Sequence, residues 1–339
     1  MNDPNPLRAA VVGAGSFGTC LAMLMANRGY SVELWARNSS VAEGVNRHHR
    51  NPRYLTDYRL PEAVHATTSL EEALSGMDVV LSVVPSHGVR DVWGRAKSWL
   101  APEALVISAS KGLEVGSGML TSQVLREVLP AEAHARLVVL SGPSFAREIA
   151  EGRPTVVSVA CENESYAVAA QSLLSSERLR CYSNPDVQGV ELGGALKNVI
   201  AIAVGIAEGM EAGLNARAAT ITRGLVEITR LGVALGAREE TFQGLSGMGD
   251  LVLTCTGDLS RNRRVGLELG RGKKLDDILA GLHQVAEGVL TTRSTHELAQ
   301  AHGVRMPIAE AVYAVLFQGL EPAEAGRMLM TGQLRSERE

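Results

Sequence analysis

The chain has 339 residues, a length that favours two domains, and 45% of them are hydrophobic. Only 4% are aromatic and the formal net charge is −4, so the composition offers neither stacking rings nor a positive field for nucleic acid. The N-terminus lacks the pattern of a signal peptide, and the uncharged stretch 198–207 covers about half of the ~20 residues that a membrane span needs. We therefore expect a cytoplasmic protein with no nucleic-acid partner and no membrane span.

Short apolar strands alternate with helices in the first part of the chain. The pattern predicts one helix over 19–28 and strands over 9–12, 31–35, 79–84, 105–109, 137–140 and 155–160. Repeated strand–helix–strand units predict a parallel sheet covered on both faces, the α/β doubly wound arrangement of a Rossmann-type domain. We assign this domain to residues 1–185.

From Val187 onward the periodicity is helical and predicts no strand. Helices are expected over 193–209, 216–235, 275–281, 292–301, 308–317 and 322–330. The second domain, residues 186–339, is therefore predicted to be all-helical.

Residues 13–18 read Gly-Ala-Gly-Ser-Phe-Gly, follow the first predicted strand and open a helix. Backbone N–H groups and the helix dipole at such a turn can hold the pyrophosphate of a dinucleotide, whereas a tight turn without a ligand is the alternative. No acidic residue stands at the tip of the second strand. Arg37 there could clasp a 2′-phosphate with help from Asn38, which favours NADPH over NADH, unless it is a plain surface charge.

Polar residues follow the later strands at the edge where ligands bind in open α/β sheets. Lys111 precedes a glycine and could reach a cofactor or substrate oxygen, or it is a solvated loop lysine. Residues 141–146, Ser-Gly-Pro-Ser-Phe-Ala, form an anion seat or a helix cap. His87 could act as a general acid, but its surroundings equally indicate a capped turn.

Lys197 is a lone charge in a predicted helix that is apolar on nearly every side. A buried ammonium costs several kcal/mol without a partner, so either a partner is present or the side chain reaches solvent. A desolvated lysine can exchange a proton with a carbonyl or alcohol oxygen, and Asn198 beside it can donate hydrogen bonds to substrate.

A possible partner for this lysine lies further along the chain. Asp250 follows Gly-Met-Gly at 247–249 and offers a carboxylate to Lys197. Residues 260–262, Ser-Arg-Asn, supply several hydrogen-bond donors suited to a phosphate dianion, although a helix cap with solvated arginines is the alternative. The four cysteines form no Cys-x-x-Cys pair and have no histidine spacing typical of a metal site, so we expect no metal.

These segments together resemble the soluble bacterial NAD(P)-dependent glycerol-3-phosphate dehydrogenases along nearly the whole chain. The resemblance rests on six motifs in order: Gly-Ala-Gly-Ser-Phe-Gly at 13–18, Ser-Lys-Gly at 110–112, Ser-Gly-Pro-Ser-Phe-Ala at 141–146, Glu-x-x-x-Ala-Leu-Lys-Asn at 191–198, Gly-x-Gly-Asp at 247–250 and Ser-Arg-Asn at 260–262. It implies reversible reduction of dihydroxyacetone phosphate to sn-glycerol 3-phosphate with NADPH or NADH, supplying glycerophospholipid synthesis. It is also compatible with a homodimer.

The resemblance further implies roles for individual residues. Lys197 would be the proton donor and acceptor, with Asp250 setting its environment. The phosphorylated small-molecule substrate would contact Lys111, Gly142, Ser144, Lys197, Asn198, Asp250, Ser260, Arg261 and Asn262. The dinucleotide would contact Gly13, Gly15, Ser16, Phe17, Gly18, Arg37, Lys111, Ala146, Arg261, Val285 and Glu287.

Two rival interpretations remain open on the residues alone. Another two-domain NADP-dependent reductase, of the ketopantoate or 3-hydroxyacid type, would bind a carboxylate where we expect a phosphate. A non-catalytic NADPH-sensing regulator would keep the glycine turn but would not need Lys197, so Lys197→Ala would leave its function intact.

Overall fold

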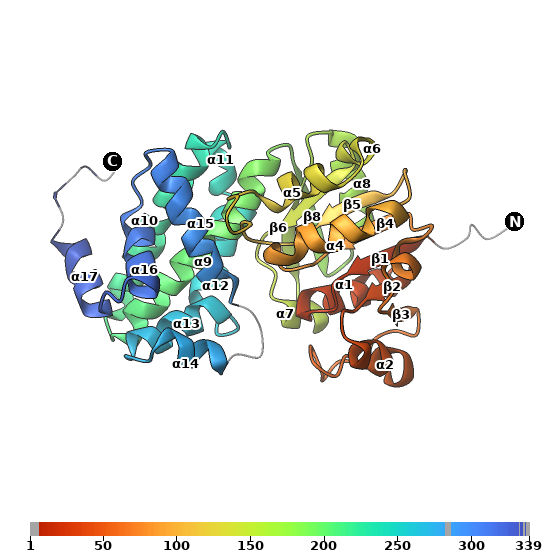
Figure 1. Ribbon diagram of the computed structural model, residues 1–339, viewed down its shortest axis with the longest axis horizontal. Helices are drawn as coiled ribbons and strands as arrows, with labels where there is room; N and C mark the ends of the chain where they lie inside the picture. Colours follow the sequence, from red (N-terminus) through yellow and green to blue (C-terminus); the bar gives the residue numbers. More distant parts are fainter. Residues whose placement is uncertain (1–6, 282–285, 332, 335, 337–339) are drawn as a thin grey trace, which may run out of the picture. The chain divides into compact units, whose positions relative to one another are not determined.

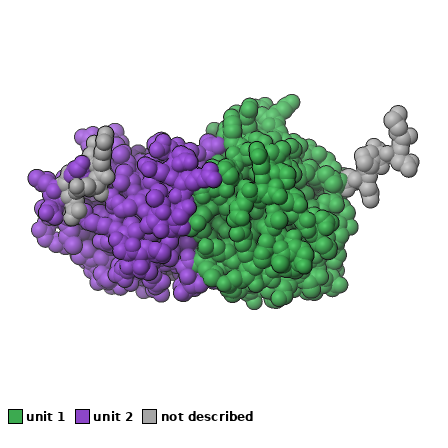
Figure 2. All heavy atoms as spheres, turned by 90° about the horizontal axis from the view of Figure 1, so that it is seen from above, with its two compact units in different colours: residues 1–111, 119–191 green, residues 112–118, 192–339 purple. Residues whose placement is uncertain are grey.

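The computed structural model describes residues 7–281, 286–331, 333–334 and 336. The chain forms two compact units, one of residues 1–111 and 119–191 and the other of residues 112–118 and 192–339 (Figure 2). Residues 112–118 belong to the second unit because they pack on its helices; a Cβ on Gly118 would lie 3.3 Å from the Leu298 side chain. The third change of unit falls between Glu191 and Leu192, inside a helix. The domain limits inferred from the sequence, 1–185 and 186–339, stay a prediction.

The first unit is built on an eight-stranded sheet (Figure 1). Its strands are β1 (Arg8–Val12), β2 (Ser31–Trp35), β3 (Val64–Thr67), β4 (Val79–Ser82), β5 (Leu105–Ser108), β6 (Leu137–Ser141), β7 (Thr155–Ala160) and β8 (Leu179–Asn184). They lie in the order β3-β2-β1-β4-β5-β6-β7-β8, and β1 to β6 are parallel. The strand order reverses between β1 and β4, which is where ligands bind in sheets of this topology.

The sheet is not parallel throughout, and this corrects the expectation from the sequence. β7 pairs antiparallel to β6, with Val139 opposite Ala160, while β7 and β8 are parallel to each other. Only the five-residue helix α7 (Ala146–Ala150) lies between β6 and β7. It turns the chain at the carboxyl edge of β6 instead of carrying it back across a face of the sheet, as a parallel crossover requires.

Helices cover both faces of this sheet (Figure 1). Alternate residues of β1 enter different cores: Ala9 and Val11 join one buried cluster, and Ala10 and Val12 join the other. The other helices of the unit are α1 (Ser16–Asn27), α2 (Ser39–His48), α3 (Leu70–Leu74), α4 (Val89–Ala96), α5 (Thr121–Val128), α6 (Ala131–His134) and α8 (Glu164–Leu174), with short 3-10 turns η1 (Ser86–Gly88) and η2 (Lys97–Trp99).

Apart from an isolated β-bridge at Leu113, all described secondary structure of the second unit is helical, as predicted from the sequence. The unit contains most of α9 (Val187–Gly209), then α10 (Gly213–Ala234), α11 (Glu239–Phe242), a π-helical turn η3 (Leu245–Gly249), α12 (Asp250–Thr256), α13 (Arg261–Gly270), α14 (Leu275–Ala280), α15 (Glu287–Ala301), α16 (Pro307–Phe317) and α17 (Pro322–Met330). Among the described residues, α9 alone is long and apolar enough to cross a membrane, but 89% of its most apolar window is buried inside the protein. It is a core helix.

Candidate active site

The glycine turn at residues 13–18 connects β1 to α1, and two of its glycines are required by the fold. Gly13 has a φ of +119°, and a Cβ there would lie 2.6 Å from the carbonyl oxygen of Val83, at the end of β4. A Cβ on Gly18 would overlap the carbonyl oxygen of Gly13. Gly15 is different, because its φ is −72° and a Cβ there would have no atom within 4 Å. Packing within the chain therefore does not require a glycine at position 15, and the space beside it is open.

The turn presents the N-terminus of α1. The first intrahelical bond runs from the Thr19 N–H to the Gly15 carbonyl at 2.8 Å, so the N–H groups of residues 16–18 have no partner in the helix. Among the described side chains none caps this end, and no acidic residue lies in its first turn. The partial positive charge of a 12-residue helix is thus available to an anion such as a pyrophosphate.

Arg37 and Asn38 follow β2, at the same edge of the sheet. The Arg37 side chain is exposed, as a side chain that meets a ligand phosphate would be. Asn38 caps α2: its Oδ1 accepts hydrogen bonds from the Ser40 N–H at 2.9 Å and the Ser40 hydroxyl at 2.7 Å. The oxygen of Asn38 is therefore used inside the protein, and any help it gives Arg37 must come from its amide nitrogen.

Lys111, Gly142 and Ser144 meet at the carboxyl ends of the neighbouring strands β5 and β6. The Gly142 carbonyl accepts hydrogen bonds from Lys111 Nζ at 3.2 Å and from the Ser144 hydroxyl at 2.9 Å. Gly142 has a φ of +132°, and a Cβ there would lie 3.1 Å from the Cα of Val157. The glycine is needed for this turn, which brings a cation and a hydroxyl together next to Ala146 at the start of α7.

Lys197 of α9 forms an ion pair with Asp250, the first residue of α12. The pair lies inside the second unit and was predicted from the sequence. A Cβ on Gly193, one helical turn before Lys197, would lie 2.5 Å from the Ser246 carbonyl, so this glycine lets η3 approach α9. That close approach carries Asp250 to the lysine.

The segment after α12 lies against the same part of α9. Ser260 caps α13, its hydroxyl accepting the Arg263 N–H at 3.3 Å. Asn262 Oδ1 accepts the N–H of Gly288 at 3.0 Å, which leaves its amide group as the donor end. A Cβ on Gly288 would lie 2.9 Å from the Asn198 carbonyl and 2.8 Å from Asn262 Oδ1. Asn198 and Asn262 are therefore neighbours, and the exposed Arg261 precedes Asn262 as the first residue of α13.

Glycines fix the position of α13 against α9. A Cβ on Gly205 or Gly209 of α9 would overlap carbonyl oxygens of α13, and a Cβ on Gly266 or Gly270 of α13 would overlap carbonyl oxygens of α9. The two backbones touch where these four glycines lie, because none of them carries a side chain. Lys197, Asn198 and Asn262 therefore cannot shift relative to one another without breaking this contact.

Arg263, which stands beside the predicted phosphate donors, has a structural role. Its guanidinium donates to both carboxylate oxygens of Glu208, at 2.8 and 2.7 Å, and pairs with Asp258 at 3.0 Å. These bonds raise the pKa of Arg263 and lower that of Glu208. The arginine ties the start of α13 to the end of α9.

Three further residues were candidates for the site from the sequence: Glu287, Val285 and His87. Glu287 is the half-buried first residue of α15, so it lies next to Gly288 in the cluster above. Val285 lies outside the described residues. His87 is exposed on η1 and belongs to a short turn, in agreement with the structural alternative for that residue.

Glu191, part of one motif but without a predicted role, is a buried carboxylate in the first unit. It accepts hydrogen bonds from the Thr121 hydroxyl at 2.5 Å, from the Ser122 N–H at 3.0 Å and from the Ser122 hydroxyl. Burial raises its pKa, and these donors oppose that rise. The carboxylate connects the N-terminal part of α9 to the start of α5. The only sequence signal for this contact was the threonine and serine at 121–122, which resemble an ordinary helix cap.

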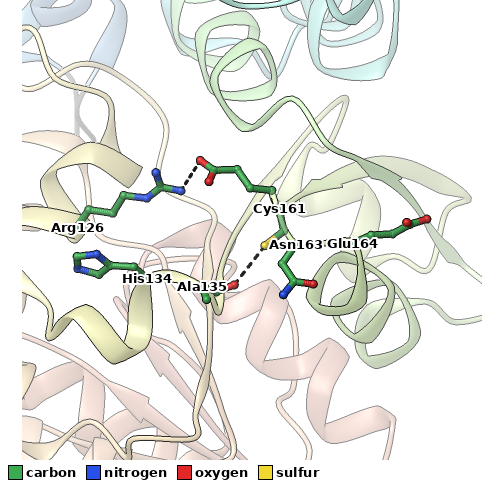
Figure 3. A pocket seen from close by; sticks show the side chains of 7 residues that line it. Arg126, His134, Ala135, Cys161, Asn163 and Glu164 are labelled. Atoms are coloured by element: carbon green, nitrogen blue, oxygen red, sulfur yellow. Dashed lines mark hydrogen bonds and ion pairs between the residues drawn. The ribbon is translucent and has the colours of Figure 1, made fainter.

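A surface pocket lies elsewhere in the first unit (Figure 3). Cys161 follows β7 and its thiol donates to the Ala135 carbonyl at 3.6 Å, just before β6. Because β7 runs antiparallel to β6, this pocket lies at the amino edge of the parallel strands, opposite the glycine turn. Arg126 in its wall is paired with Glu162 at 2.7 Å. The pocket contains none of the predicted site residues.

The arrangement of residues defines a class of protein. A sheet of order 3-2-1-4-5-6 with a glycine turn at its switch point is typical of dinucleotide binding. A buried lysine–aspartate pair in a helical unit can donate a proton to a substrate or accept one from it. These are features of two-unit nicotinamide-dependent dehydrogenases. The two halves of the model for NAD-dependent glycerol-3-phosphate dehydrogenase match residues 8–167 (its N-terminus) and 186–327 (its C-terminus). The chain belongs to this family.

Individual relatives agree with the family assignment. Glycerol-3-phosphate dehydrogenases [NAD(P)+] of Syntrophotalea carbinolica and Myxococcus xanthus are each 51% identical over 331 residues, covering 98% of this chain and 99% of each relative. The crystal structure of glycerol-3-phosphate dehydrogenase from Coxiella burnetii superposes with a TM-score of 0.91 at 40% identity, over 97% of this chain and 100% of that one. A ketopantoate reductase from Ralstonia eutropha, at 16% identity and a TM-score of 0.63, shares the fold alone.

Proposed function

We propose that the protein catalyses the reversible reduction of dihydroxyacetone phosphate to sn-glycerol 3-phosphate with NADPH or NADH. The buried ion pair of Lys197 and Asp250, next to the donor cluster of Asn198 and Asn262, carries this proposal. A ketone that carries a phosphate needs both a proton source and donors for the phosphate. Membership of the glycerol-3-phosphate dehydrogenase family supports this substrate over a carboxylate-bearing one.

The dinucleotide fits the first unit. The uncapped start of α1 can hold the pyrophosphate, the open space beside Gly15 admits it, and Arg37 can meet a 2′-phosphate. We assign to the cofactor site the residues Gly13, Gly15, Ser16, Phe17, Gly18, Arg37, Lys111, Ala146, Arg261, Val285 and Glu287. When bound, the reduced nicotinamide supplies a hydride to the ketone carbon.

The residues of the chain then have separate tasks. Lys197 donates a proton to the oxygen that becomes an alcohol, and it accepts one in the reverse reaction. Asp250 keeps the ammonium charged and in place. The substrate phosphate is held by Ser260, Arg261 and the Asn262 amide, while Lys111, Gly142, Ser144 and Asn198 contact the rest of the substrate.

The test is the oxidation of NADPH, followed by its absorbance, with dihydroxyacetone phosphate and, separately, ketopantoate as substrate. We expect turnover with the phosphorylated ketone alone, and a lower KM for NADPH than for NADH because Arg37 meets the 2′-phosphate. Lys197→Ala should bind NADPH and lose turnover. Turnover with ketopantoate, or unchanged turnover in the Lys197→Ala variant, would contradict the proposal.

The wider role follows from the reaction. Its product supplies glycerophospholipid synthesis, which is consistent with a cytoplasmic enzyme that has a small-molecule substrate. A homodimer is part of the same proposal, and sedimentation of the purified protein tests it.

A further inference from the structure

Asn51 is a fully buried polar side chain in the segment between α2 and β3. Its amide nitrogen donates to the Ala14 carbonyl at 3.0 Å and to the Thr19 hydroxyl at 2.8 Å. Its oxygen accepts the N–H groups of Arg53 at 3.0 Å and Tyr54 at 3.1 Å. Both donors and both lone pairs of the amide are therefore in use.

One of these partners lies inside the glycine turn. The described chain has no cis peptide bond, so the carbonyl of Ala14 and the N–H of Gly15, which share one peptide plane, point in opposite directions. The Ala14 carbonyl points inward, toward Asn51 and Thr19, both of which are 0% exposed. The Gly15 N–H must then point outward, to the side where a Cβ on Gly15 would meet no atom.

Flexible glycines make such a support necessary. Peptide planes next to glycine can rotate at little steric cost, so a turn with three glycines in six residues does not hold its N–H groups by itself. Asn51 supplies the missing constraint from another segment. That segment is itself anchored: the Tyr58 hydroxyl donates to Glu151 at 2.9 Å and Asp57 pairs with Arg147 at 3.4 Å, both on or next to α7.

We propose that Asn51 is a positioning residue that sets the peptide between Ala14 and Gly15 for the diphosphate of the dinucleotide. This inference rests on the proposed cofactor site. It does not place Asn51 in contact with the cofactor. Asn51 acts through the backbone, so that the donor is preoriented before binding and less free energy is spent on ordering the turn.

The test is Asn51→Asp, which keeps the size and the acceptor oxygen of the side chain but removes the N–H donors. A carboxylate then faces the Ala14 carbonyl, and repulsion rotates the peptide. We expect the Kd of NADPH to rise by about 10-fold or more, with kcat at saturating NADPH changed by less than about 2-fold. The Ki of adenosine 2′-phosphate, which lacks the diphosphate, should stay within about 2-fold of wild type.

Thr19→Val is a second variant, which removes one hydrogen-bond partner of Asn51 and preserves the shape of the side chain. We expect a smaller loss of NADPH affinity that is equally selective for the diphosphate. Asn46→Asp is the matched control. The Asn46 amide also bonds the backbone from α2, donating to the Ala66 carbonyl and accepting the Ala66 N–H, both at 2.8 Å, but it does not touch the turn. We expect Asn46→Asp to leave the Kd of NADPH within about 2-fold of wild type.

The outcomes separate the inference from the function on which it rests. Two results would overturn the positioning role. One is that Asn51→Asp loses affinity for NADPH and for adenosine 2′-phosphate equally, and the other is that Asn46→Asp loses as much affinity for NADPH as Asn51→Asp does. Gly15→Ala blocks the open space directly. If Gly15→Ala weakens NADPH binding and Asn51→Asp does not, the inference about Asn51 fails alone. If Gly15→Ala also leaves NADPH binding unchanged, the proposed cofactor site itself is wrong.

Discussion

Lys197 and Asp250 form an ion pair from which water is nearly excluded, with 8% and 1% of the two side chains exposed. Removing two charges from water costs several kcal/mol per ion, and an apolar pair of similar volume is often as stable. The Thr254 hydroxyl adds a 3.4 Å hydrogen bond to the carboxylate, and the buried Cys255 thiol next along α12 has its pKa raised by burial to about 12. Stability alone does not explain this pair, and its place in the proposed reaction is proton transfer.

We expect Asp250→Ala to destabilise the protein by about 3–5 kcal/mol, because it removes the carboxylate that is paired with a buried ammonium. The double variant Lys197→Met/Asp250→Leu should regain most of that free energy of unfolding, since neither charge remains. Urea unfolding measures both changes in the free energy of unfolding, and NADPH oxidation measures turnover. Both variants should lack turnover, and turnover near wild type in the refolded double variant would remove Lys197 from the mechanism.

Gly15→Ala and Gly18→Ala should separate a ligand requirement from a packing requirement within one turn. Gly15 has an ordinary φ and open space around it, so alanine there should change the free energy of unfolding by less than about 1 kcal/mol. It should still raise the Kd of NADPH by about 10-fold or more, which corresponds to the loss of about one hydrogen bond. A Cβ on Gly18 overlaps the Gly13 carbonyl, so that variant should lose stability first. Tight NADPH binding by Gly15→Ala would show that the space serves no cofactor.

Gly288→Ala should act on the substrate end of the site. The added methyl group would lie 2.8 Å from Asn262 Oδ1 and 2.9 Å from the Asn198 carbonyl, so Asn262 must turn away. We expect the KM for dihydroxyacetone phosphate to rise by about 10-fold while the Kd of NADPH changes less than about 2-fold. Gly94→Ala in α4 is the control without this contact, because Gly94 is also helical and a Cβ there would have no atom within 4 Å. A KM equal to wild type in Gly288→Ala would contradict the role of Asn262.

Glu227 should make the stability of the second unit depend on pH. Its carboxylate accepts the N–H groups of Ile308 at 2.8 Å and Ala309 at 3.1 Å at the start of α16, yet burial raises its pKa from 4.5 to about 7. A pKa raised in the folded state means that the folded protein holds the proton more tightly. The contribution of protonated Glu227 to the free energy of unfolding is therefore full below about pH 4.5 and is lost as the pH rises toward about 7.

The experiment compares wild type with Glu227→Gln, which has no proton to lose. Relative to the variant, the free energy of unfolding of wild type should fall by up to about 3 kcal/mol from pH 4.5 to pH 7 and then stay level. Urea midpoints at several pH values measure the difference. Parallel pH curves for the two proteins would mean that Glu227 titrates normally.

Strands rich in buried apolar residues were predictable, and the polar edge strands were not. The predicted bounds match β2, Ser-Val-Glu-Leu-Trp, and β7, Thr-Val-Val-Ser-Val-Ala, because Val and other apolar residues in a short run indicate a strand. Two edge strands were not predicted: β3, Val-His-Ala-Thr, and β8, Leu-Arg-Cys-Tyr-Ser-Asn. Edge strands carry polar residues, so their sequences match a loop equally well. The reversed direction of β7 depends on the length of α7, which periodicity does not fix.

The sequence by itself determined the alternating sheet, the helical second half and a buried lysine that needs a partner. These features depend on local periodicity and on the free-energy cost of burying charge, both of which a single segment expresses. The tertiary structure decided which distant groups meet: Asn51 with Ala14, Asn262 with Gly288, and Glu191 with Ser122. Such pairs join segments 26 to 69 residues apart, and they form only where the folded chain brings two segments together.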